Sequence, residues 1–193
     1  MEHYFSEKQN SKLDLKKINV KSKNLDFNVF SAKGVFSKNR LDKGTKLLIE
    51  NAIVRGKVLD LGCGIGIVGI CIKKLNQKLD VTMSDVNERA LEIAKMNSKN
   101  LDVKIVKSDV FNNLDEEFDV ILLNPPQAAG KETCFRMIRE SFEHLKKNGF
   151  FELVARHNKG GKTYMNYMKE IFGNVKDIVK ESGYRVYLAK KLI

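Results

Sequence analysis

Glycine-rich and polar segments follow several apolar runs of this chain, and the first of them has the composition of a ligand-binding loop. Residues 58–66 read VLDLGCGIG, with a glycine at every second position from Gly62 to Gly66. Glycines allow a sharp turn and a close approach of the backbone to a ligand, with the N-terminus of the following helix behind it. We expect Asp60, Gly62, Cys63, Gly64 and Gly66 to contact a ligand here.

The glycine pattern alone leaves two ligand classes open. Gly64, Gly66 and Gly69 fit the GxGxxG dinucleotide fingerprint, and Asp85 follows Gly64 by 21 residues, as that fingerprint expects for a ribose-binding acid. Asp60 favours the other class, because a carboxylate at a strand–loop junction repels a pyrophosphate and attracts an ammonium or sulfonium group. We therefore expect a cationic or zwitterionic nucleoside; a purely structural helix or turn cap is the alternative role for Asp60.

Two further acidic residues follow the next two apolar runs. Asp85, with Val86 beside it, ends the run 81–85, and Asp109 follows the run 103–107. The carboxyl ends of parallel strands meet at one edge of an open α/β sheet, where ligands of such folds bind. Asp60, Asp85 and Asp109 are therefore predicted to surround one site.

The fourth apolar run ends in Asn124-Pro125-Pro126-Gln127. Two consecutive prolines contribute carbonyl oxygens and no N–H donors, so this strand tip is rich in hydrogen-bond acceptors. Such a tip fits a donor with two hydrogens, an exocyclic or amide NH₂ group, and two hydrogen bonds would aim its lone pair at an electrophile. Catalysis would then rest on orientation and electrostatic stabilisation, without a strong base. A tight structural turn is the alternative.

The elements that position these residues follow from hydrophobic periodicity. Short apolar runs alternate with helical patterns from about residue 56 onward, which predicts right-handed βαβ units. Strands are predicted at Val58–Leu61, Asp80–Ser84, Val103–Lys107, Phe118–Leu123 and Phe150–Ala155. Helices are predicted at Lys43–Ile53, Glu88–Ser98 with Asn87 as its cap, Lys131–Lys147 and Gly161–Phe172.

The last two strands differ, because no crossover helix fits between Val175–Lys180 and Tyr184–Ala189. They predict an antiparallel hairpin at one edge. The expected fold class is α/β, a Rossmann-like doubly wound seven-stranded sheet, mostly parallel with a C-terminal antiparallel hairpin. A small hairpin of Asp26–Phe30 with Gly34–Ser37 is predicted before the core.

Positive charge is concentrated near the N-terminus. The 193 residues include 35 Lys and Arg against 24 Asp and Glu, a formal charge of +11, and residues 1–57 carry 13 and 6 of these, a net +7. Two explanations of this excess are open. The segment binds an anionic partner such as RNA, or its lysines are simply solvated in a composition rich in Lys and Asn. We expect a basic N-terminal extension, residues 1–55, packed on a core domain of residues 56–193.

The cysteines, Cys63, Cys71 and Cys134, are odd in number and form no CxxC pair. Reduced thiols and no metal site are expected. The N-terminal segment has no apolar signal sequence, and the apolar stretch 65–72 is too short to cross a membrane. A cytoplasmic protein without a membrane partner is predicted, and both a monomer and a homodimer are open.

These segments give the sequence a resemblance to class I S-adenosylmethionine-dependent methyltransferases, whose first motif is similar to VLDLGCGIG. The resemblance implies that the glycine loop and Asp60 surround the methionine part of the cofactor. It also implies that Asp85 binds both ribose hydroxyls and that Asp109 binds the adenine amine. The product would be S-adenosylhomocysteine, and no metal is implied.

The tetrapeptide 124–127 resembles the [Asn/Asp/Ser]-Pro-Pro-X motif of methyltransferases that act on adenine, cytosine, guanine or glutamine nitrogen. The wider resemblance, over about residues 26–191, is to small archaeal relatives of bacterial guanine-N2 methyltransferases of small-subunit rRNA; it includes segments 34–37, 41–45 and 129–131. Two features depart from that pattern. Gln127 replaces an aromatic or apolar residue that packs on the target base, and no counterpart of the second, degenerate domain copy of the bacterial enzymes is expected within these 193 residues.

The resemblance implies an RNA methyltransferase acting on an exocyclic amine, most often guanine N2 in rRNA, with tRNA as a second RNA class. Reaching such an amine in a duplex requires base flipping. The three residues of the Asn-Pro-Pro motif are the predicted catalytic groups, and Asn124 also borders the cofactor. Predicted RNA contacts are Gln127, Lys38, Arg40 and Lys43, with Lys33 in the same basic segment. The alternatives are a protein-glutamine N5-methyltransferase, an NAD-binding dehydrogenase and a non-catalytic RNA-binding module.

Overall fold

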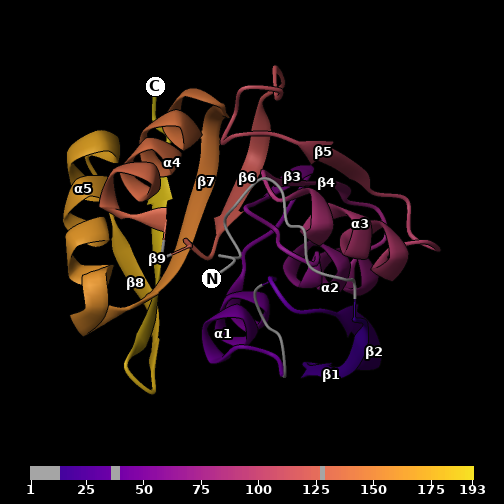
Figure 1. The fold of residues 1–193 in the computed structure, drawn as a ribbon. Helices are drawn as coiled ribbons and strands as arrows, with labels where there is room; N and C mark the ends of the chain where they lie inside the picture. The colour runs from indigo at the N-terminus through magenta and orange to yellow at the C-terminus, as the bar shows by residue number, and fades with distance from the viewer. Residues whose placement is uncertain (1–13, 36–39, 127–128) are drawn as a thin grey trace.

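The computed structural model describes residues 14–35, 40–126 and 129–193. Its centre is a seven-stranded sheet with the strand order β5-β4-β3-β6-β7-β9-β8 (Figure 1). The first five of these strands are parallel, β9 is antiparallel to β7, and β8 is antiparallel to β9. The predicted fold class is confirmed. The strands are β3 (Lys57–Leu61), β4 (Asp80–Asp85), β5 (Lys104–Lys107), β6 (Phe118–Leu123), β7 (Leu145–Arg156), β8 (Lys176–Glu181) and β9 (Tyr184–Lys190).

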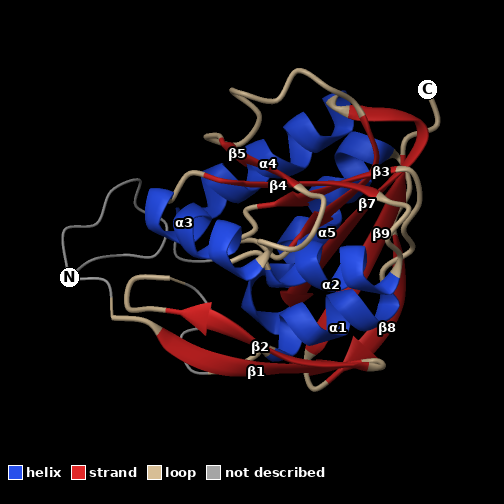
Figure 2. Cartoon of the chain, turned by 90° about the vertical axis from the view of Figure 1, so that its right-hand side faces the viewer, coloured by secondary structure: helices blue, strands red, loops and turns tan. Residues whose placement is uncertain are grey.

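Helices cover both faces of the sheet, which is why its central strands are apolar on both sides. Strands β3 and β6 are buried over almost their whole length. Apolar side chains of α1, α2 and α3 pack on one face, and those of α4 and α5 pack on the other (Figures 1 and 2). These helices are α1 (Lys43–Asn51), α2 (Ile67–Leu75), α3 (Glu88–Asn97), α4 (Lys131–Glu143) and α5 (Lys162–Phe172), with a short π-helical turn, η2 (His157–Gly161), before α5.

The hairpin before the core differs from the prediction. Strand β2 (Leu25–Ser31) pairs antiparallel with β1 (Lys16–Ser22), which precedes it, whereas Gly34 and Val35 of the predicted partner belong to no strand; residues 36 and 37 lie outside the described residues. Alternate residues of β1 are buried, but four of its seven residues are Lys or Asn, so its apolar side is short and was not recognised. The hairpin rests on α3, where the amide of Asn97 exchanges hydrogen bonds of 2.7 and 3.0 Å with the backbone of Phe30.

The helix predicted at Lys131–Lys147 is four residues too long. It ends at Glu143, and β7 begins two residues later because Leu145 is fully buried and pairs with Phe118 of β6. Asn148, just beyond the predicted end of the helix, has a positive φ of 66° and lies within β7. In the part of the chain that the structure describes, no helix is long and apolar enough to span a membrane.

Candidate functional site

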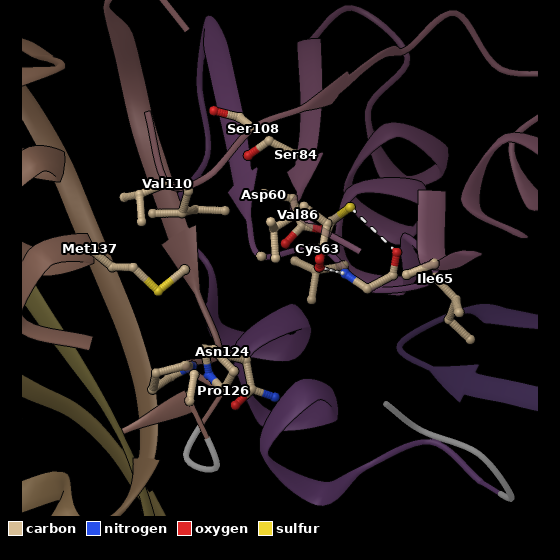
Figure 3. A pocket seen from close by; sticks show the side chains of 18 of the residues that line it. Asp60, Cys63, Ile65, Ser84, Val86, Ser108, Val110, Asn124, Pro126 and Met137 are labelled. Atoms are coloured by element: carbon tan, nitrogen blue, oxygen red, sulfur yellow. Dashed lines mark hydrogen bonds between the residues drawn. The ribbon is translucent and has the colours of Figure 1, made fainter. Parts of the chain in front are cut away.

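A cavity of about 270 Å³ opens at the carboxyl edge of β3, β4 and β6. Most of the predicted site residues line it: Asp60, Gly62, Cys63, Gly64, Asp85, Val86, Asp109, Asn124, Pro125 and Pro126. Figure 3 shows Asn124 and Pro126 at one end, Ser84 and Ser108 at the other, and Asp60, Cys63 and Val86 between them. Thr45, Ser84, Ser108 and Met137 are among the other lining residues, none of which was a predicted contact.

The glycines of the loop have different tasks. Gly62, Gly64 and Gly66 all have positive φ, at 68°, 55° and 85°, which favours glycine at each. A Cβ at Gly64 would meet no atom within 4 Å, whereas one at Gly69 would lie 2.6 Å from Met83 of β4. Gly69 is thus explained by the close packing of α2 on β4. Of the three loop glycines, Gly62 and Gly64 line the cavity; Gly66, which was also predicted to contact a ligand, is not among the lining residues.

Asp60 lines the cavity and also has the structural capping role considered for it. Its residue is only 3% exposed, and its Oδ2 accepts a hydrogen bond of 2.8 Å from the N–H of Gly69, in the first turn of α2. It therefore supplies a side-chain cap that Gly66, the residue before this helix, lacks. Burial raises the pKa of Asp60 to about 7, against the Gly69 hydrogen bond, which lowers the pKa.

Asp85 is held by backbone donors on both carboxylate oxygens. The N–H of Gly64 donates to Oδ2 at 2.8 Å, and the N–H of Asn87 donates to Oδ1 at 2.9 Å. Removal of the carboxyl group from water raises the pKa of Asp85, and these hydrogen bonds oppose the rise. Asn87 in turn caps α3 through a bond of 3.1 Å from the N–H of Ala90, as predicted. The carboxylate is thus fixed between the glycine loop and α3.

Asp109 follows β5 by two residues and is exposed. Its carboxylate forms an ion pair with Arg136 of α4, a partner that the sequence analysis did not predict. Ser108, its neighbour, accepts a hydrogen bond of 3.1 Å from the N–H of Asn113. Asp109 therefore lies at the rim of the cavity, and its carboxylate already pairs with the guanidinium group of Arg136.

The Asn-Pro-Pro segment presents two acceptors to the cavity. The side-chain nitrogen of Asn124 donates to Thr45 Oγ1 at 3.0 Å, and no described residue donates to its Oδ1. The Pro126 carbonyl accepts from the N–H of Ala129 at 2.8 Å, so it is occupied by a turn. No described residue donates to the Pro125 carbonyl. The acceptors left for a ligand are Asn124 Oδ1 and Pro125 O.

Several predicted substrate contacts are not at the cavity. Gln127 and Lys38 lie outside the described residues. Arg40 and Lys43 are exposed and do not line the cavity, although both lie within two residues of Asp42 at the start of α1. Within the described ranges, no group of three or more His, Cys, Asp or Glu could hold a metal ion.

The cavity fits S-adenosylmethionine better than a dinucleotide. Three of its lining residues are carboxylic acids, and none of the described lining residues is Lys or Arg. Such a lining favours a ligand with a cationic sulfonium and ammonium and with hydroxyl donors, and it disfavours a pyrophosphate. The hydroxyl of Ser84 is buried without a hydrogen-bond partner among the described residues, an arrangement that a ligand atom would complete. The lining residues that could hold the cofactor are Asp60, Gly62, Gly64, Ser84, Asp85 and Asp109.

Comparisons with known proteins agree with this fit. Residues 26–188 match the family described as Methyltransferase small domain. The chain is 37% identical over 199 residues to the uncharacterised protein YbxB of Bacillus subtilis, with 99% of both chains covered. It is also 37% identical over 175 residues to ribosomal RNA small subunit methyltransferase C of Actinobacillus pleuropneumoniae, covering 86% of this chain and 52% of that relative.

A solved structure shows the same fold. The 16S rRNA N2 G1207 methyltransferase (RsmC) of T. thermophilus, determined in complex with AdoMet and guanosine, superposes with a TM-score of 0.82 at 23% identity. The match covers 94% of this chain and 51% of that one, so the chain spans about half the length of these rRNA methyltransferases.

The fold and the site define an S-adenosylmethionine-dependent methyltransferase, which confirms the predicted cofactor. More narrowly, the chain belongs to the Methyltransferase small domain family. The NAD-binding dehydrogenase considered as an alternative is excluded by this membership, and the third glycine of its fingerprint is accounted for by helix packing.

Proposed function

We propose that this chain methylates an exocyclic amino group of small-subunit ribosomal RNA, with guanine N2 as the acceptor. One observation carries the proposal: Asn124 Oδ1 and the Pro125 carbonyl, two acceptors without donors among the described residues, share a cavity with the three carboxylates. The names of two relatives support the RNA class, and one of them specifies N2 methylation. A cytoplasmic location follows from this substrate.

The residues of the chain act mainly on the acceptor amine. S-adenosylmethionine, when bound, supplies a methyl group on a positively charged sulfur. Asn124 Oδ1 and Pro125 O each accept one N–H of the amine, which holds its nitrogen and turns the lone pair out of conjugation with the ring. Positive charge that develops on the nitrogen as the N–C bond forms lies against these two oxygen dipoles. The resulting arylammonium proton is acidic enough to leave to water, so no side chain has to act as a strong base.

The basic segment before the core is suited to hold the RNA backbone. The carbonyl of Lys33 accepts a hydrogen bond of 3.3 Å from Arg89 of α3, which ties this segment to the helix that follows Asp85. Lys43 is the first residue of α1, where a cation opposes the helix dipole and a structural role does not explain it. We propose that Lys33, Arg40 and Lys43, all exposed, contact phosphates beside the cavity.

The proposal is tested by incubating the protein and labelled S-adenosylmethionine with three separate pools, ribosomal RNA, transfer RNA and protein. The methylated residue is then identified by mass spectrometry. N2-methylguanosine in the small-subunit rRNA is the expected product. A methylated glutamine would identify a protein substrate, and cofactor binding without transfer to any pool would indicate a non-catalytic module; both outcomes contradict the proposal.

Two variants separate the acceptor site from the cofactor site. Asn124→Ala removes one of two oxygens that stabilise the transition state, so kcat should fall by about a hundredfold or more, with the cofactor Kd within about threefold of the wild type. Asp85→Ala should weaken cofactor binding itself, because both of its oxygens are fixed at the cavity. Equilibrium dialysis and single-turnover transfer measure the two effects, and full turnover by Asn124→Ala would refute the mechanism.

A further inference from the structure

We propose that Thr45 and Asp42, at the start of α1, are positioning residues that fix the amide of Asn124 with its oxygen towards the substrate. This inference rests on the proposed function, because it concerns the group that would hold the acceptor amine. Thr45 lines the same cavity as Asn124, although 79 residues separate the two in sequence. The segment before the core domain would thereby take part in the reaction.

The contacts between the three side chains form a short chain of hydrogen bonds. Asn124 Nδ2 donates to Thr45 Oγ1 at 3.0 Å and lies 3.4 Å from Asp42 Oδ2. Thr45 Oγ1 donates to the same Asp42 oxygen at 3.4 Å, and the N–H of Thr45 donates to it at 2.9 Å. The side-chain nitrogen of Asn124, the hydroxyl of Thr45 and the N–H of Thr45 therefore all lie within hydrogen-bond distance of the same carboxylate oxygen of Asp42.

Asp42 determines which end of the Asn124 amide faces α1. An ionised carboxylate only accepts hydrogen bonds. The Thr45 hydroxyl gives its single proton to Asp42, so it can only accept from Asn124. A rotated Asn124 amide would place its oxygen against Asp42 Oδ2 and Thr45 Oγ1, and the single hydroxyl proton of Thr45 could then satisfy only one of these two oxygens, leaving two acceptors in contact. The NH₂ group of Asn124 is therefore held towards α1, and its oxygen is left for the cavity.

The polarity matters because the proposed substrate is itself a donor. With Oδ1 in the cavity, Asn124 accepts from the substrate amine; a rotated amide would present its own N–H groups to that amine and repel it. Without this constraint the Asn124 amide would populate both orientations, because the free-energy difference that separates them is about that of one net hydrogen bond. The expected loss is about tenfold in kcat.

The positioning pair is itself held in place from two sides. Asp42 is the N-cap of α1, since its side chain accepts from the N–H of Thr45 in the first turn of the helix. From the other side, the hydroxyl of Tyr184, at the start of β9, lies 3.5 Å from Asp42 Oδ1. Gly44 permits this approach, because a Cβ there would lie 2.9 Å from the Tyr184 ring and 3.0 Å from Asp42.

The first test compares Thr45→Val, which keeps the shape and removes the hydroxyl, with Thr45→Ser, which keeps the hydroxyl. Single-turnover transfer to 16S rRNA should slow about tenfold for Thr45→Val and less than about threefold for Thr45→Ser, with cofactor Kd unchanged within about threefold in both. Thr163→Val, the same change on the exposed side of α5, is the matched control and should transfer at the wild-type rate.

A second readout does not depend on activity. The side-chain ¹⁵NH₂ signals of Asn124, assigned by their loss in Asn124→Asp, should shift and exchange faster with solvent in Thr45→Val but not in Thr45→Ser. If Thr45→Val fails to fold, Asn124→Asp supplies a substitute test. The new carboxylate faces Asp42, so transfer should fall, and adding Asp42→Asn should restore it at least about threefold.

The outcomes distinguish this inference from the proposed function. Unchanged transfer and unchanged Asn124 signals in Thr45→Val, alongside an inactive Asn124→Ala, would overturn the positioning role and leave the proposed function intact. The positioning role would equally be overturned if adding Asp42→Asn gave Asn124→Asp no recovery. An active Asn124→Ala would instead overturn the proposed function.

Discussion

A buried carboxyl group away from the cavity should make the stability of this protein fall as the pH rises. Glu152 of β7 is 0% exposed. Its Oε1 accepts from the N–H of Ile53 at 2.8 Å, and its Oε2 has no partner among the described residues. Burial raises the pKa of Glu152 from 4.5 to about 8, against the Ile53 hydrogen bond, which lowers it. The folded chain therefore retains a proton that the unfolded chain releases.

The size and sign of the effect follow from this difference. Below pH 4.5 both states carry the proton, and the full stability is present. Between pH 4.5 and about 8 only the unfolded chain ionises, so the free energy of unfolding declines by about 1.4 kcal/mol per pH unit. The decline is about 2 kcal/mol between pH 6 and pH 8, because the folded-state carboxyl group itself begins to ionise as the pH approaches its pKa, and the decline levels off above that pKa.

The assay is urea denaturation of the wild type and Glu152→Gln from pH 5 to pH 9. Gln retains an oxygen for the Ile53 N–H and cannot ionise, so the variant should gain about 2 kcal/mol relative to the wild type from pH 6 to pH 8. Glu117→Gln, the same change at an exposed position, is the control and should show no such gain. A constant difference between the wild type and Glu152→Gln would refute the reasoning.

Two further predictions concern binding. Because burial places the pKa of Asp60 at about 7, affinity for the cationic cofactor should rise several-fold from pH 6 to pH 8 in calorimetric titrations, and Asp60→Asn should flatten this rise; an equal slope in Asp60→Asn would contradict the role of its charge. Replacing Lys33, Arg40 and Lys43 together by Gln should weaken RNA binding and reduce the slope of log K against log salt by up to about 3, whereas an unchanged slope in filter-binding assays would exclude phosphate contacts there.

The sheet was predictable because its strands carry strong local signals. The segment Phe118–Leu123 is largely apolar and ends in prolines, which marks both its burial and its end. The β1–β2 hairpin gave a weak signal, since lysines alternate with its few apolar residues. The early end of α4 is decided by a tertiary contact, the pairing of Leu145 with Phe118, which no local pattern in Lys131–Lys147 reveals.

Some residues around the cavity were likewise predictable from local sequence, and others are brought there only by tertiary contacts. Strand ends determine where Asp60, Asp85 and Asn124 lie, so the sequence could place them at one edge. Arg136 reaches Asp109 from a different helix, and Thr45 contacts Asn124 from a segment 79 residues earlier in the chain. Thr45 lies three residues after Asp42, a spacing that indicates a helix cap, and within segment 41–45, which is part of the resemblance; neither feature reveals its contact with Asn124.

The contact between Tyr184 and Asp42 also links β9, the last described strand of the chain, to the acceptor side of the cavity. The described residues that line the cavity all lie between 45 and 137, so none of them belongs to β9. A change that displaces Tyr184 is therefore expected to impair the placement of the substrate amine more than the binding of the cofactor.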